Sequence, residues 1–485
     1  MTSRLEHSPT VAVVGGGLAG LAAGCALADS GFRVTVLERK PYLGGRASSY
    51  QHPGTGEVVD NCQHVLLGCC TNLIQLYQRL GVQEKIRWYD RLTFLEPGGR
   101  ASVVAPSVLP APLHTMPSFL RVSCLGPMDK LAIGRAMFAL AFDEEFQREE
   151  RLFKRADGPE HSEESFLAWL KRHGQTQRAI ERFWKTILVS ALNEDLDRVS
   201  VRYAAQVVRE SFLKSAAAGR MGVPTVPLTE LYSVAGDYIQ ARGGEIRLRS
   251  AVDSFEVKTN GVQLSGASEK LDFDFAVLAA SFDVLPRMLP QTAESDSLRG
   301  KLGNFESSPI TGIHLWFDRP ITDLDHAVLL DRTIQWMFHK SKLLAASSYA
   351  DGGEGKGSYV ELVVSSSRAL VEKAKPEIVE LALNELREFF PNARSASLLK
   401  STVIKEVNAT YSPQPGVDAY RPKSETNWPR VFLAGDWIAT GWPATMEGAV
   451  RSGYIAAECV AKAWGREAKF LVPDLRAGGF MRLFE

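Results

Sequence analysis

The sequence VAVVGGGLAG, residues 11–20, decides the fold of this chain. Its four apolar residues predict a buried parallel strand, and the glycines after them predict a tight turn into a helix. We expect Gly15 to permit that turn and Gly17 to let the backbone approach a pyrophosphate. Gly20 should allow the helix to pack closely on the strand. Together these residues indicate a dinucleotide-binding turn.

The residues after this turn strengthen the prediction. Leu18 and Ala19 open a helix whose free N–H groups and positive dipole end favour bound phosphate. A second strand over residues 33–37 ends at Glu38, about twenty residues on, where a ribose 2′-hydroxyl needs an acceptor. We assign Glu38 and the adjacent Arg39 to the cofactor.

Composition indicates an ordinary globular protein. The 485 residues predict two or three domains, and 56 basic residues balance 56 acidic ones. No overall charge therefore favours nucleic acid, and we expect no nucleic-acid partner. The six cysteines show no zinc-type spacing, so we expect no metal site and reduced thiols: Cys25, Cys62, Cys69, Cys70, Cys124 and Cys459.

The first ten residues lack the apolar core of a signal peptide, and no run of eighteen apolar residues predicts a membrane-spanning helix. We therefore expect a cytoplasmic protein, with peripheral contact to the inner face of the membrane left open.

The chain is expected to pass back and forth between two domains. We predict a discontinuous cofactor domain from residues 9–85, 223–290 and 425–466. The predicted substrate domain consists of residues 86–222, which form a mostly helical insertion, and residues 291–424. Residues 467–485 form a tail. The expected helices are 72–80, 128–142, 165–172, 176–192, 201–214, 228–241, 376–389 and 445–464. The expected strands after the first two are 245–249, 252–257, 261–265, 275–280, 310–317, 333–339, 359–364, 400–407 and 431–434.

A second glycine turn indicates a flavin rather than a nicotinamide dinucleotide. Gly44 and Gly45 follow the ribose acid closely and allow backbone near a cofactor. Arg46, next to them, can neutralise a diphosphate.

The carboxyl-terminal part adds two further signals. Gly435 and Asp436 end a buried strand, where the carboxylate can accept from sugar or ribityl hydroxyls. Thr445 is the expected N-cap of a helix that begins at Met446, and its free N–H groups can stabilise negative charge on a reduced flavin.

These motifs resemble those of the flavin amine oxidase and phytoene desaturase superfamily. The resemblance lies in residues 11–27, in Glu38, in LGGRASS at 43–49 and in the stretch from FLAGDW to RSG at 432–453. DNCQHVLLG at 60–68, with Asn-Glu-Asp at 193–195, is closer to the hydroxysqualene dehydroxylase branch. Cys62 stands where that branch is expected to have glycine.

The resemblance implies an α/β fold, with a Rossmann-like (GR2-type) FAD domain interwoven with a mixed sheet and helical substrate domain. It implies FAD as cofactor, with Gln63, His64 and Val252 among the residues against it. The reaction implied is reduction of hydroxysqualene to squalene, with FAD kept reduced by an external electron donor. Asp60 and His64 are the candidate catalytic residues, His64 as acid, and a purely structural role for each stays open.

Other interpretations stay open. The same fold can serve a desaturase or oxidase of another isoprenoid or an amine, or a lipid carrier without redox chemistry, as in Rab GDP-dissociation inhibitors. His314 and His339 are expected to face solvent or hold ordinary partners. A hydrophobic substrate suggests membrane contact through residues 103–119 and 128–142, or through the tail at 470–472 and 480–484. Packing within the protein is the alternative for both.

Overall fold

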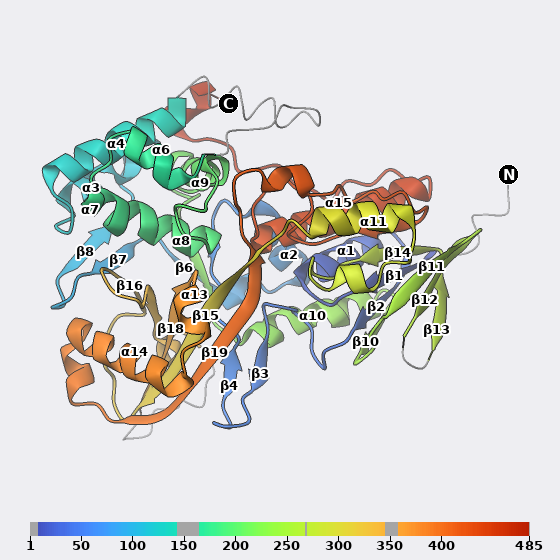
Figure 1. The fold of residues 1–485 in the computed structure, drawn as a ribbon, viewed down its shortest axis with the longest axis horizontal. Helices are drawn as coiled ribbons and strands as arrows, with labels where there is room; N and C mark the ends of the chain where they lie inside the picture. Colours follow the sequence, from blue (N-terminus) through green and yellow to red (C-terminus); the bar gives the residue numbers. More distant parts are fainter. Residues whose placement is uncertain (1–7, 143–163, 267–268, 345–356, 485) are drawn as a thin grey trace.

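The computed structural model describes residues 8–142, 164–266, 269–344 and 357–484. Two sheets dominate it (Figure 1). A parallel sheet with its helices forms one end of the molecule, and a larger sheet with a helical insertion forms the other.

The parallel sheet has the strand order β10-β2-β1-β14-β20. These strands are β1 (Thr10–Val14), β2 (Arg33–Glu38), β10 (Glu245–Leu248), β14 (Phe275–Leu278) and β20 (Val431–Leu433). Strands from three separated parts of the chain therefore build one sheet, and each pair that includes β1, β2 or β14 is parallel.

Both faces of this sheet are covered, which explains the unbroken apolar run in β1. Val11 and Val13 pack in one core with α1 (Leu18–Asp29), α10 (Leu228–Gln240) and α15 (Met446–Ala463). Ala12 and Val14 point the other way, into a core shared with the antiparallel strands β11 (Ser254–Lys258), β12 (Gly261–Ser265) and β13 (Lys270–Phe273).

The larger sheet has the order β19-β15-β18-β17-β16-β7-β8. Its strands are β7 (Leu92–Leu95), β8 (Ala101–Val104), β15 (Ser307–Phe317), β16 (His326–Leu329), β17 (Trp336–Phe338), β18 (Ser358–Ser365) and β19 (Leu398–Tyr411). Helix α14 (Lys375–Phe389) packs on one face. The other face meets Cys62 and Val59, in the part of the chain that the sequence assigns to the active site.

The remaining helices and strands connect these two sheets. The insertion contains α3 (Met116–Arg121), α4 (Pro127–Phe142), α6 (Phe166–Arg172), α7 (Gln177–Ala179), α8 (Thr186–Leu192) and α9 (Val201–Val208). The connecting elements are β3 (Ser49–Gln51), β4 (Val58–Asp60), β5 (Leu66–Leu67), α2 (Thr71–Leu80), β6 (Ile86–Tyr89), β9 (Met221–Pro224), α11 (Ala293–Leu302), α12 (Lys340–Leu343) and α13 (Arg368–Val371). None of the described helices is long and apolar enough to span a membrane.

Most expected elements are confirmed, with three corrections. Residues 86–104 contain β6, β7 and β8, so this part of the expected helical insertion is strand; two of its strands join the larger sheet. The expected helices 176–192 and 201–214 contain π-helical segments, at Ile180–Lys185 and Arg209–Leu213. Several short elements were not expected: strands β3, β4, β5, β9, β13 and β16 and helices α3, α11, α12 and α13. The insertion as predicted also includes residues 143–163, which lie outside the described residues.

A polar junction fixes the insertion to the larger sheet. Asn193 ends α8 in the left-handed conformation, with φ 53°, and its amide bonds Ser308 O and Thr410 Oγ1. The next residue, Glu194, is fully buried and accepts from both terminal nitrogens of Arg368 at 2.6 Å. The Asn-Glu-Asp motif is thus a structural joint.

We predict that Glu194→Gln destabilises the protein by about 2 kcal/mol, because Arg368 loses its charged acceptor. Burial alone would raise the pKa of Glu194, but bonds from Arg368 and Ser412 lower it below the ordinary value. This stabilisation is therefore present above the unfolded pKa and is lost as pH falls through the lowered one. Urea unfolding followed by tryptophan fluorescence measures the change. Exposed Glu256→Gln is the control, and an equal shift in both would contradict the prediction.

Candidate active site

The first glycine turn is formed by backbone contacts that leave no room for side chains. Gly15 has φ 113°, and a Cβ there would lie 2.7 Å from Ala279 O. A Cβ on Gly20 would lie 1.9 Å from Gly15 O. Helix α1 therefore begins directly on the turn, at Leu18 and Ala19, as the sequence predicts.

Glu38 lies beside this turn at the end of β2. Its carboxylate accepts from Gly16 N and from Lys40 N, both at 2.7 Å, and is buried. Arg39 is exposed. Val252 lines a small hollow with Leu37 at the same end of the sheet. The structure brings Glu38, Val252 and the glycine turn together, and each remains a predicted cofactor contact.

The second glycine turn lies against the first. Gly44 pairs with Gly17 in an isolated parallel bridge, and Gly44 N donates to Gly16 O at 2.9 Å. Gly45 has φ 64°, and a Cβ there would lie 2.8 Å from Gly17 Cα. Of the described residues, only Gly45 Cα lies within 4 Å of a Cβ placed on Gly17. These two turns form an open backbone cradle.

The end of β20 closes the cradle from the other side. Asp436, which is buried, accepts from Arg46 at 2.6 Å, and Arg46 also donates to Ala409 O at 2.8 Å. Gly435 N donates to Ser452 Oγ on α15. Arg46 is predicted to contact the diphosphate and Asp436 the ribityl group. In this structure the two side chains form an ion pair with each other.

Helix α15 begins as the sequence predicts. The Thr445 side chain accepts from Gly448 N at 3.1 Å, which makes it the N-cap, and Met446 is the first helical residue. Met446 Sδ accepts from Tyr232 OH at 3.5 Å, so the start of the helix is tied to α10.

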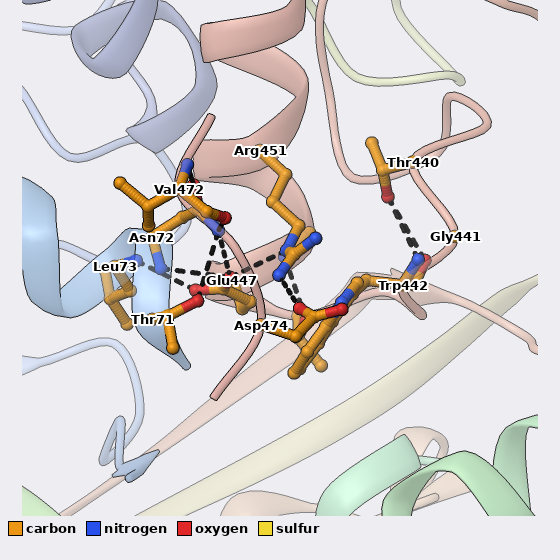
Figure 2. A network of polar contacts seen from close by, with 12 residues as sticks. Thr71, Asn72, Leu73, Thr440, Gly441, Trp442, Glu447, Arg451, Val472 and Asp474 are labelled. Atoms are coloured by element: carbon orange, nitrogen blue, oxygen red, sulfur yellow. Dashed lines mark hydrogen bonds and ion pairs between the residues drawn. The ribbon is translucent and has the colours of Figure 1, made fainter. Parts of the chain in front are cut away.

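Glu447 joins this helix start to α2 and the tail (Figure 2). It is fully buried and accepts from Asn72 N at 3.1 Å and from Leu73 N at 2.8 Å. Helix α2 has no N-cap side chain of its own, so Glu447 satisfies its first amides. Arg451 donates to Glu447 at 2.7 Å and also pairs with Asp474 of the tail.

The tail is therefore docked at this point. Phe470 N and Leu471 N donate to Glu458 on α15, and both side chains pack against the core of the parallel sheet. The packing alternative holds for residues 470–472.

The segment with Asp60 and His64 lies between the two sheets. Asp60 Oδ1 accepts from Ser49 at 2.6 Å and from Leu228 N at 3.1 Å, and Oδ2 accepts from Lys340 at 2.7 Å. Burial alone would raise the pKa of Asp60, but Lys340 and these hydrogen bonds lower it. Asp60 is thus an ionised, fully bonded anchor.

His64, the other candidate catalytic residue, has a partly buried ring that is hydrogen-bonded to the backbone. Its Nδ1 lies 2.8 Å from Cys62 O, to which it can donate. Desolvation lowers the pKa of the ring below the ordinary histidine value. Burial therefore favours the neutral ring, and the acid role of His64 stays a prediction. Gln63 Oε1 accepts a hydrogen bond from Lys340 Nζ at 2.8 Å. Cys62, which stands where glycine was expected, does not have positive φ.

Two residues that the sequence did not single out complete this cluster: Lys340 and Glu361, both buried. Glu361 Oε2 lies 3.4 Å from Lys340 Nζ. A single acid within the apolar strand Tyr-Val-Glu-Leu-Val at 359–363 was a usable signal. Lys340 had none, because only the fold brings α12 to Asp60.

His314 and His339 are expected either to face solvent or to hold ordinary partners, and the structure shows the second, because both are buried. Both do hold ordinary partners. His314 Nδ1 lies 2.8 Å from Tyr359 OH, and His339 Nε2 lies 2.8 Å from Ser358 Oγ.

FAD fits the cradle, because the open backbone at Gly17 and Gly45 allows a diphosphate to approach and Glu38 lies beside it. The family profile of flavin-containing amine oxidoreductases matches residues 18–461. The chain belongs to this family. It is therefore a flavoprotein oxidoreductase with FAD as its cofactor.

Curated relatives in this family include carotenoid desaturases. A probable zeta-carotene desaturase of Synechococcus elongatus is 27% identical over 93% of this chain and 98% of its own length. A 15-cis-phytoene desaturase of the same organism is 26% identical over 93% and 95%.

Solved flavoenzyme structures share the fold. An oxidoreductase from Methanosarcina mazei is 17% identical, with TM-score 0.68 over 92% of this chain and 98% of its own. Cyclohexylamine oxidase from Brevibacterium oxydans is 18% identical, with TM-score 0.66 over 95% of this chain and 100% of its own.

We predict that Gly45→Ala lowers the affinity for FAD about tenfold or more, because its Cβ would press on Gly17. Gly56→Ala is a matched control: Gly56 also has positive φ, 73°, but its Cβ would meet nothing within 4 Å. Titration of the flavin-free protein with FAD, followed by flavin fluorescence, measures both. Equal losses of FAD affinity in the two variants would show that strain from positive φ, and not the contact with Gly17, causes the effect.

Proposed function

We propose that this flavoprotein reduces hydroxysqualene to squalene, with loss of the hydroxyl as water. The observation that carries the proposal is the place of residues 60–68, the stretch of closest resemblance to the hydroxysqualene dehydroxylases. This stretch forms the wall between the FAD cradle and the larger sheet. The carotenoid desaturases among the relatives, named for C40 isoprenoids, support a long isoprenoid substrate.

The chain's own residues would perform three tasks. The two glycine turns and Glu38 would bind the cofactor, and Arg46 and Asp436 would contact its diphosphate and ribityl groups. When bound, FAD supplies hydride chemistry. The apolar cluster around Cys62 and Val223, with Val65, Leu67, Ile310 and Trp336 packed against it, excludes water. A dry surface of this kind protects an allylic cation left by a departing hydroxyl.

Two alternative functions differ in how well the observations support them. A desaturase of another isoprenoid would use the same residues in the oxidative direction, and the names of the curated relatives favour it. A carrier without redox chemistry is disfavoured by the intact cradle, the Glu38 carboxylate and the family itself.

Anaerobic incubation of the protein with hydroxysqualene and chemically reduced FAD is expected to yield squalene, identified by mass spectrometry. Reduced FAD replaces the external donor, which we propose keeps the cofactor reduced in the cell. A parallel incubation of the oxidised protein with more saturated isoprenoids tests whether it acts as a desaturase. Bleaching of the flavin there, with no squalene in the first reaction, would overturn the proposal.

We further propose that the enzyme takes its substrate from a lipid surface through one exposed apolar patch. The patch lies on β8, α3 and α4 and on the loops between them, with Phe480 of the tail beside it. Its members are 37–102% exposed: Val103, Val108, Leu109, Leu113, Met116, Leu120, Met128, Leu131, Phe138 and Phe480. Phe480 N donates to Ala111 O, which holds the tail against this patch. Exposed Arg121 and Arg135 lie among these residues and favour an anionic lipid surface.

The patch predicts a specific loss of vesicle binding. Leu131→Ser with Phe138→Ser, on the exposed face of α4, should reduce flotation with vesicles that contain anionic lipid. Leu399→Ser, which is 64% exposed on β19, should leave flotation unchanged. Unchanged flotation of the double variant would exclude this patch as the contact.

A further inference from the structure

The loop between β20 and α15 is fixed by one buried arginine, Arg421. Its guanidinium group donates to four backbone carbonyl oxygens of this loop. Nη2 lies 3.1 Å from Asp436 O and 2.8 Å from Trp442 O, and Nε lies 3.3 Å from Trp437 O. The fourth acceptor is Ile438 O, which Nη2 also bonds. Only 1% of the Arg421 side chain is exposed.

Two further side chains hold the other side of the guanidinium group. Nη1 donates to the hydroxyl of Tyr203 on α9 and lies 3.3 Å from Asp418 Oδ1. Asp418 also pairs with Arg202. Burial alone would raise the pKa of Asp418, but Arg202 and Arg421 lower it, so its carboxylate is the counter-charge of both. Every nitrogen of Arg421 therefore has a partner, which a buried guanidinium requires.

The loop that Arg421 holds carries part of the predicted cofactor site. Asp436 lies at its start, and the carboxylate of this residue pairs with Arg46 beside the second glycine turn. Trp442 lies at its end, shortly before α15, and the Arg451 guanidinium lies 4.8 Å from its ring (Figure 2). Fixing the carbonyls of this loop therefore fixes where the Asp436 carboxylate lies and where α15 starts.

Gln206 provides a matched comparison on the same loop. It lies on α9 and donates to a single carbonyl, Gly441 O, through a solvent-exposed bond of 2.9 Å. The guanidinium group of Arg421 has five N–H donors in one plane and can bond several carbonyls at once. A lysine ammonium has its three donors on one nitrogen. Loss of Arg421 would leave buried carbonyls without a donor, whereas loss of Gln206 would leave one at the surface.

We propose that Arg421 is a positioning residue for FAD. Its four bonds hold residues 436–442, before the cofactor arrives, in the arrangement that cofactor binding requires. Because all its nitrogens already have partners in the protein, Arg421 acts through the loop and not by contact with the cofactor. The proposal rests on FAD as the cofactor and not on the proposed substrate, so it applies equally to a reductase and to a desaturase.

The first test is the FAD affinity of Arg421→Lys, which keeps the positive charge but not the planar group. Its dissociation constant for FAD is expected to rise about tenfold or more, because ordering the loop then reduces the free energy of binding. Gln206→Met is the control and should change this constant by less than about twofold. Titration of the flavin-free proteins with FAD, followed by flavin fluorescence, measures both.

Hydrogen–deuterium exchange tests the arrangement of the loop before FAD binds. Amides of the loop are hydrogen-bonded, for example Ala439 N to Pro422 O at 2.8 Å. Peptides that cover residues 436–442 should therefore exchange slowly in the flavin-free wild type, compared with the turn at residues 53–56. In flavin-free Arg421→Lys these peptides should exchange as fast as that turn and slow down when FAD is added. Peptides from β1 should keep the wild-type rate.

The outcomes that overturn the proposal are distinct. Wild-type FAD affinity in Arg421→Lys, or an equal loss in Gln206→Met, would overturn it. Rapid exchange of residues 436–442 in the flavin-free wild type would do so as well, whether or not the variant folds. Faster exchange throughout Arg421→Lys, including β1, would show a general structural role instead. None of these measurements uses hydroxysqualene, so failure to form squalene would overturn the proposed function alone.

Discussion

The close approach of helix α1 to the chain on two sides is the constraint on which the rest of the structure depends. A Cβ on Gly20 would lie 1.9 Å from Gly15 O, and a Cβ on Gly453 would lie 2.2 Å from Ala19 O. Helix α1 is therefore held between the turn after β1 and helix α15, backbone against backbone. This contact joins an early and a late part of the chain, because α1 starts at residue 18 and α15 ends at residue 463.

The active site follows from that contact. With α15 fixed on α1, the strand before α15 joins the parallel sheet beside β14, and Asp436 meets Arg46. Glu447 then satisfies the free amides of α2, and Arg451 attaches the tail (Figure 2). The Arg46–Asp436 contact joins residues 390 apart, and the Leu73–Glu447 contact joins residues 374 apart. The cofactor cradle is thus a product of long-range contacts.

The second half of the site comes from the larger sheet. One face packs on α14 and is apolar, while the other face presents His314 and Glu361 toward residues 60–63. Burial acts on both carboxyl groups at this junction, but Lys340 and two further hydrogen bonds lower the pKa of Asp60, whereas burial raises the pKa of Glu361 to about 7.

The sequence by itself determined the parallel sheet, the glycine turns, Glu38 and the N-cap at Thr445, because each depends on local spacing and backbone freedom. It also predicted most helices, whose apolar periodicity is local. Only the tertiary structure decided how strands β6 and β7 pair, since their distant partners are β9 and β16, whereas β7 and β8 also form a local hairpin. It also decided the ionisation of the candidate site. Asp60 and His64 lie four residues apart in the sequence, but burial lowers the pKa of His64, whereas Lys340, 280 residues from Asp60, outweighs burial and lowers the pKa of Asp60. Ionisation depends on which groups meet in a buried space, and that is a property of the folded chain.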